Sequence, residues 1–215
     1  MAGVAIKDIH FDQIYASDLE RAYNTASIIY ENNMYAEKTE VSEIRQSVQT
    51  NELLRERSFG VYELKAGDEF KLAAKEAGYE DDAEFKPEGG ENNKEVKERV
   101  VDFLAFLTQT SFQNEQIEKD KIKDNNNILV VSHGGWIWQL IKYFAQEYKS
   151  DITGSLSDIN LNNGMLYIKN TTIFGFDLLI DVHTGEIISV NCTKYNSTQH
   201  LNQLEEYVQE ENLTP

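Results

Sequence analysis

The feature that most constrains the fold of this chain is an apolar run that ends in a glycine turn. Residues 128–135 read Ile-Leu-Val-Val-Ser-His-Gly-Gly, and residues 136–148 have the composition of an apolar helix. A short continuous apolar run of this kind is typical of a strand buried in a parallel sheet. The segment therefore predicts a strand, a turn and a helix, with His133 at the carboxyl end of the strand. Open α/β sheets place their ligand crevice at that end.

The turn after this strand has the properties of an anion site. Gly134 and Gly135 let a ligand approach the backbone closely. The helix that follows offers free N–H groups and the positive end of a dipole. The alternative is a plain strand-to-helix turn in which His133 only caps the helix, and the motif alone favours neither interpretation.

The remaining patterns predict a single α/β domain over residues 1–215. Helices are expected from Ser17, where Ser17 and Glu20 form a capping box, over residues 68–77, and over a long segment with Val96 to Leu107 on one face. Strands are expected at residues 11–15, 164–169, 174–182 and 186–193, with a hairpin turn at 183–186. This order indicates a three-layer α/β/α sandwich with a mostly parallel central sheet and an antiparallel C-terminal hairpin.

Charge and composition narrow the partners. The formal net charge of −17 disfavours nucleic acid and anionic membrane surfaces, both of which are bound through clustered Lys and Arg. A phosphorylated small molecule remains possible in a locally basic pocket. The single cysteine, Cys192, fits a reducing compartment such as the cytoplasm. No apolar stretch reaches the length of a transmembrane helix, no secretory signal is visible, and protein partners stay open.

Two further segments carry candidate binding residues. Arg21 lies in the first turn of a predicted helix, where it either points into an anion site or pairs with acidic neighbours. Glu56 stands between Arg55 and Arg57, which should keep its carboxyl ionised. If phosphate fills the site, that balance reverses and Glu56 can hold a proton as a general acid requires. The alternative is a solvated charge cluster.

Three blocks in this order resemble the histidine phosphatase (phosphoglycerate mutase-like) superfamily. They are Ser-Asp-Leu-Glu-Arg-Ala at residues 17–22, Leu-Arg-Glu-Arg-Ser-Phe-Gly at 54–60, and Val-Val-Ser-His-Gly-Gly at 130–135. The segment Phe-Lys-Pro-Glu-Gly-Gly-Glu at 85–91 and the run Asn-Gly-Met at 163–165 are similar to TIGAR-type fructose-2,6-bisphosphatases. The resemblance implies hydrolysis of a sugar phosphate or bisphosphate through a phosphohistidine, and a role in regulating glycolysis.

The resemblance also assigns roles to residues. Arg21 would bind the transferred phosphoryl group, Glu56 would protonate the leaving oxygen and then activate water, and His133 would stabilise the phosphoryl oxygens. Arg57 would hold the rest of the substrate, and the Gly134 backbone would border the pocket. The resemblance implies no metal and no organic cofactor. Trp138 stands where many relatives carry a basic residue.

The block that would carry the nucleophile, a strand ending in Arg-His-Gly, does not occur in the 215 residues. His10, His183 and His200 have no such context. The resemblance implies that a first, central strand is missing too, so that its neighbours keep unpaired backbone groups. Three hypotheses follow: a phosphatase whose sequence here lacks its N-terminal part, a pseudophosphatase that binds phosphate or protein without turnover, or an unrelated α/β binding module.

Overall fold

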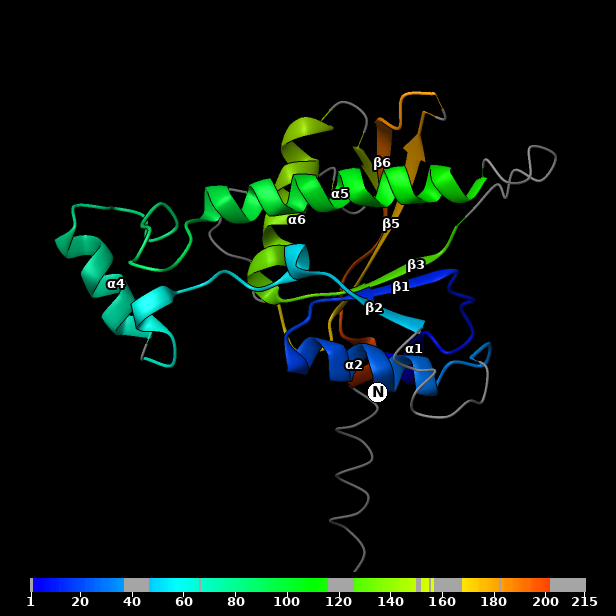
Figure 1. Cartoon of the computed structure of the whole chain (residues 1–215), viewed down its shortest axis with the longest axis horizontal. Helices are drawn as coiled ribbons and strands as arrows, with labels where there is room; N and C mark the ends of the chain where they lie inside the picture. Colours follow the sequence, from blue (N-terminus) through cyan, green and yellow to red (C-terminus); the bar gives the residue numbers. More distant parts are fainter. Residues whose placement is uncertain are drawn as a thin grey trace, which may run out of the picture.

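The computed structural model describes residues 2–36, 47–65, 67–115, 126–149, 152–154, 156, 168–181 and 183–201. Figure 1 shows an α/β body with α4 standing away from it. No helix within these ranges is both long and apolar enough to cross a membrane. The elements in chain order are α1 (Ala2–Ala5), β1 (Gln13–Ala16), α2 (Glu20–Glu31), β2 (Val48–Thr50), η1 (Glu52–Leu54), η2 (Gly60–Tyr62), α4 (Gly67–Glu76), α5 (Asn93–Glu115), β3 (Ile128–Val131), α6 (Gly134–Glu147), β4 (Ile152–Gly154), β5 (Ile173–Ile180) and β6 (Ile187–Ser197).

Strands β2, β1 and β3 form a parallel sheet in that order. The side chains of β1 alternate between its two faces, as the strand period requires. Ile14 and Ala16 pack with Ala26 of α2, whereas Tyr15 packs edge-on against Phe103 of α5. The sheet is therefore the middle layer of three, with α2 on one side and α5 on the other (Figure 1).

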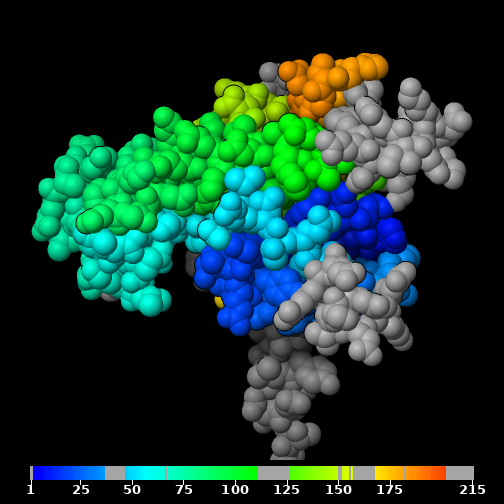
Figure 2. Space-filling model, viewed as in Figure 1, coloured from blue at the N-terminus to red at the C-terminus, as the bar shows by residue number. Residues whose placement is uncertain are grey.

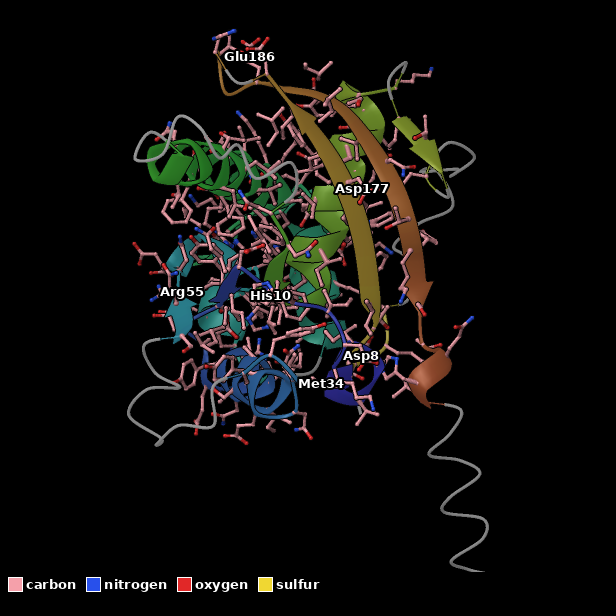
Figure 3. The ribbon with its side chains drawn as sticks, turned by 90° about the vertical axis from the view of Figure 1, so that its right-hand side faces the viewer. Asp8, His10, Met34, Arg55, Asp177 and Glu186 are labelled. Carbon is pink, nitrogen blue, oxygen red and sulfur yellow. The ribbon has the colours of Figure 1, made fainter. Side chains whose placement is uncertain are left out.

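A second, mixed sheet has the order β4-β6-β5. Strands β5 and β6 are antiparallel, and the turn between them is held by the Asp181 carboxylate, which accepts the N–H groups of His183 and Thr184. Figure 3 shows the two strands side by side, with Glu186 at the tip of the hairpin. The predicted hairpin is confirmed. Phe176 of β5 packs on Phe144 of α6, so this sheet shares the main core with α5 and α6.

The structure divides the expected sheet into two. No ladder joins the parallel sheet to the mixed sheet within the described ranges. Strand β3 is one of the two outer strands of the parallel sheet. The predicted strand at 164–169 falls almost entirely outside the described residues.

The prediction of a helix starting at Ser17 is wrong. The N–H of Ser17 still bonds to the carbonyl of Val131, which keeps Ser17 in the sheet, and α2 starts at Glu20. The Ser17 hydroxyl accepts the N–H of Leu19 at 3.3 Å, and the helix has no side-chain cap.

Residues 61–87, which include α4, form an excursion from the body, and Figure 2 shows it as a separate lobe. Its two ends meet in a neck, where the N–H of Val61 donates to the carbonyl of Glu88. Gly60 sits in this neck at φ 52°, and a Cβ added there would lie 2.1 Å from the Glu88 oxygen. Only glycine fits such a close backbone approach.

Candidate functional site

The parallel sheet brings three distant segments to one edge. Arg21 follows β1, Glu56 follows β2 and His133 follows β3, each within a few residues of the strand end. Since the strands are parallel, their carboxyl ends share one edge of the sheet. The hydroxyl of Ser132 also donates to the carbonyl of Leu54 at 2.8 Å, which ties the second segment to the third.

Arg21 and His133 are in direct contact. The Arg21 Nε–H donates to His133 Nδ1 over 3.1 Å. Because a guanidinium can only donate, Nδ1 must be the unprotonated ring nitrogen, and the proton of the neutral imidazole is on Nε2. Burial and then the nearby Arg21 charge lower the pKa of His133, which favours this neutral form.

The Nε2 atom of His133 is a donor without an acceptor. His133 is only 7% exposed, and Nε2 is buried with no hydrogen-bond partner among the described residues. A buried polar group in this condition is costly unless a ligand or water satisfies it. Arg21, by contrast, is exposed on the first turn of α2. The pair therefore offers one cation and one oriented N–H to an acceptor.

Glu56 binds the start of α6 through its carboxylate. Its Oε2 accepts the N–H of Gly135 at 3.1 Å, and its Oε1 accepts the N–H of Arg57 at 2.9 Å. Main-chain N–H groups make both of these hydrogen bonds, and the expectation that Arg55 and Arg57 keep this carboxyl ionised stays a prediction. Of the two glycines in the turn, Gly135 is the one that the site needs, since a Cβ there would lie 2.4 Å from Oε1. A Cβ on Gly134 would meet open space, and its expected place at the border of a pocket stays a prediction.

Arg57 is buried and bonded to the chain that follows the excursion. Its guanidinium donates to the carbonyls of Glu91, Phe85 and Asp82 and to the side chain of Asn93, and the residue is 8% exposed. Burial lowers its pKa despite these partners. These four hydrogen bonds to residues 82–93 join the Arg57 guanidinium to the part of the chain where the excursion returns to the body. Arg57 therefore positions the chain beside Glu56, and its expected role in binding substrate stays a prediction.

Arg55 pairs with Asp18 across the site. Its Nε donates to Asp18 Oδ1 at 2.8 Å, and this bond lowers the pKa of the Asp18 carboxyl. The Arg55 side chain is 47% exposed. Figure 3 shows Arg55 on the side of the molecule away from β5 and β6. The pair links the segment after β2 to the loop before α2 at the surface.

The sequence patterns did not identify Arg99 of α5, whose guanidinium binds main-chain carbonyls of the segment after β2. Its guanidinium pairs with both oxygens of Glu91, at 2.8 and 2.9 Å, and donates to the carbonyls of Leu53, Arg55 and Glu56. An arginine one position before buried Val100, on the apolar face of a helix, is the signal that could have found it.

The other three histidines lie elsewhere. His10 precedes β1, at the opposite end of that strand from the site, and contacts Asp12 and Tyr35. His183 is in the hairpin turn, and the Nε2 of His200 lies 3.2 Å from the Thr171 hydroxyl. No group of three or more His, Cys, Asp or Glu residues in the described ranges is arranged to hold a metal.

Trp138 lies in the core and not in the site. Its ring is 5% exposed and packs within the main core cluster, and the Lys142 ammonium lies 5.5 Å from the ring centroid.

Comparisons with known proteins identify relatives of this chain. The fructose-2,6-bisphosphatase TIGAR of Bos taurus is 30% identical over an alignment of 208 positions, which covers 79% of this chain and 74% of the relative. A 2,3-bisphosphoglycerate-dependent phosphoglycerate mutase of Cytophaga hutchinsonii is 28% identical over 158 residues, covering 70% of this chain and 63% of the mutase.

Solved structures share the fold at low identity. A mycobacterial glucosyl-3-phosphoglycerate phosphatase in complex with VO3 superposes with a TM-score of 0.62 at 18% identity, over 92% of this chain and 82% of its own. Bacillus stearothermophilus YhfR gives 0.61 at 18% identity, over 93% and 81%. The sequence model of the histidine phosphatase superfamily (branch 1) matches residues 1–168. The chain therefore belongs to the histidine phosphatase superfamily.

Proposed function

We propose that this protein is a phosphatase of sugar phosphates or bisphosphates, with fructose 2,6-bisphosphate as the first substrate to test. The observation that carries the proposal is the Arg21–His133 pair, which leaves a buried Nε2–H donor at the edge where Glu56 also lies. The similarity to TIGAR proteins supports the choice of substrate. A cytoplasmic location and a role in regulating glycolysis belong to the same proposal.

The site residues divide the work of phosphoryl transfer. Arg21, whose Nε is engaged by His133, would hold a phosphoryl oxygen through its terminal N–H groups. His133 would donate from Nε2 and stabilise the charge on the same group. In the two-step transfer that the superfamily implies, a histidine nitrogen would bond to phosphorus as the P–O bond to the sugar breaks, and the Glu56 carboxyl would give its proton to the leaving oxygen. Water would then attack the phosphohistidine, the N–P bond would break, and the Glu56 carboxylate would take the proton of the attacking water.

A covalent phosphohistidine needs a second histidine at the site. His10, His183 and His200 lie on other parts of the fold, so none of them supplies the attacking nitrogen in this arrangement. This observation favours a second candidate function, that of a pseudophosphatase that binds a phosphate group or a protein without turnover. We propose that the 215-residue chain by itself is inactive or strongly impaired, because loss of a covalent nucleophile costs several orders of magnitude in rate.

A release assay distinguishes the two functions. The purified chain is incubated with fructose 2,6-bisphosphate, and free phosphate is measured for the wild type, His133→Ala and His183→Ala. Histidine 183 is the matched control, because it lies in the hairpin turn and has no contact with the site. Hydrolysis that His133→Ala abolishes and His183→Ala leaves unchanged supports the phosphatase. Absence of hydrolysis, together with phosphate binding that depends on Arg21, supports the pseudophosphatase.

A further inference from the structure

The N-terminus of α6 is capped from a distance. Its N-cap residue, His133, makes no side-chain capping bond, because its Nδ1 is taken by Arg21. The N–H of Gly135 in the first turn instead donates to the Glu56 carboxylate, 79 positions away in sequence. A helix start attracts anions through its free N–H groups and its dipole. In this structure the anion at the helix start is the protein's own glutamate.

The seat of this carboxylate is closely fitted. One oxygen accepts from Gly135 and the other from Arg57, so both oxygens are engaged by main-chain N–H groups. The absence of a side chain at Gly135 is a condition of this contact, because a Cβ would lie 2.4 Å from Glu56 Oε1. The backbone of the Glu56 segment is fixed in turn by Arg99, which donates to the carbonyls of Arg55 and Glu56.

The donors for an external anion stand next to this seat. His133 is the residue immediately before the α6 turn, and its buried Nε2 has no partner within the described part of the chain. Arg21 reaches the other side of the same ring. His133 and Gly135 are two positions apart in this turn, so a phosphate group that reaches Nε2 would compete for the N–H that Glu56 already occupies.

We propose that the Glu56 carboxylate is a built-in competitor for the phosphate group, seated on the Gly135 N–H that an oxygen of a bound phosphate would otherwise accept. This inference rests on the anion site of the proposed function but not on turnover. A phosphate group displaces the carboxylate by offering more charge and more acceptors to Arg21 and His133 together. When the site is empty, the carboxylate accepts the Gly135 N–H at the start of α6. Anions with less charge than phosphate do not displace it, so it selects against them.

The test is binding of inorganic orthophosphate, measured by calorimetry and by the ¹H–¹⁵N resonance of Gly135. Glu56→Gln keeps the shape of the side chain but removes the charge-assisted bond, which is roughly twice as strong as a neutral one. We expect Glu56→Gln to bind orthophosphate about tenfold more tightly than the wild type, with the Gly135 resonance shifting at the same midpoint. Adding Arg21→Ala to Glu56→Gln should abolish the gain.

Two further variants separate competition from simple repulsion. Glu56→Asp keeps the charge but shortens the side chain, so the carboxylate withdraws from Gly135; we expect roughly threefold tighter binding. Glu52→Gln removes one exposed negative charge four residues earlier, beside Arg55, and should change affinity by less than about twofold. Thermal unfolding of each variant confirms that it is folded before titration.

The outcomes that would overturn the inference are distinct. They are equal or weaker binding by Glu56→Gln, wild-type affinity in Glu56→Asp, an equal gain in Glu52→Gln, or no orthophosphate binding by any variant. A failure of the proposed function appears separately, as absence of fructose 2,6-bisphosphate hydrolysis in samples that show the expected order of affinities.

Discussion

At the residue scale, His133 couples the site to pH. Burial and Arg21 lower its pKa, so the folded state binds a proton at this ring less tightly than an unfolded chain does. A base whose folded pKa is depressed stabilises the fold above its unfolded pKa of about 6.5, and that contribution is lost as pH falls through the folded value. We therefore expect the free energy of unfolding, measured by urea denaturation, to fall between pH 7.5 and 5.5.

The histidine responsible can be identified by substitution. His133→Gln cannot take up this proton, so its loss of stability over the same pH range should be smaller than that of the wild type. His183→Gln, in the exposed hairpin turn, should retain the full loss. His200 is a second contributor, because burial lowers its pKa as well. Parallel curves for the wild type and His133→Gln would contradict this account.

Arg99 is a residue whose removal should cost considerable stability near the site. Arg99→Met leaves the Glu91 carboxylate, 23% exposed, without its bidentate partner and frees three main-chain carbonyls. We expect a loss of about 2–3 kcal/mol in urea denaturation, since breaking a largely buried pair strands the remaining charge.

The matched control is Lys97→Met, two positions earlier on the same helix. Lys97 pairs with Glu147 at the surface, and such exposed pairs contribute about 0–1 kcal/mol. Arg99→Lys should restore part of the loss through the charge but not the forked hydrogen bonds. A cost for Arg99→Met no larger than that of Lys97→Met would refute the anchoring role.

At the scale of elements, the neck of the excursion depends on Gly60. Gly60→Ala places a Cβ against the Glu88 carbonyl at a positive φ, so the backbone of the neck must shift. We expect a loss of about 2 kcal/mol or more and faster proteolysis within residues 61–87. Gly67→Ala is the control in the same excursion, because it meets nothing within 4 Å and favours α4 by up to about 1 kcal/mol. Equal effects of the two substitutions would argue against the neck.

The elements also show what the sequence could predict. The apolar run and the glycine turn place β3 and α6 within two residues of their observed bounds, because period and turn chemistry are local properties. The predicted start of α2 at Ser17 was wrong, because the N–H of Ser17 bonds to the Val131 carbonyl and keeps Ser17 beside the parallel sheet. The partners of Arg57 could not be predicted, because they include main-chain carbonyls 25 or more positions away, which no spacing pattern reveals.

At the scale of the whole molecule, two three-stranded sheets pack around one core without a ladder between them in the described ranges. Strand β3 pairs with β1 along one edge, where the Val131 carbonyl accepts the N–H of Ser17. The N–H and C=O of one strand residue point to the same edge, and the direction alternates along the strand. The N–H groups of Leu129 and Val131 therefore face β1, whereas those of Ile128 and Val130 face the other edge.

Hydrogen exchange followed by NMR tests this division of the molecule. We expect the amides of Leu129 and Val131 to exchange at least about tenfold more slowly than those of Ile128 and Val130, because only the first two are bonded within the parallel sheet. Strand β1 is the internal control: it lies between β2 and β3, so its consecutive amides should all be protected. Uniform protection along β3 would show that its second edge is paired in solution. That result would contradict the expectation that β3 is an outer strand.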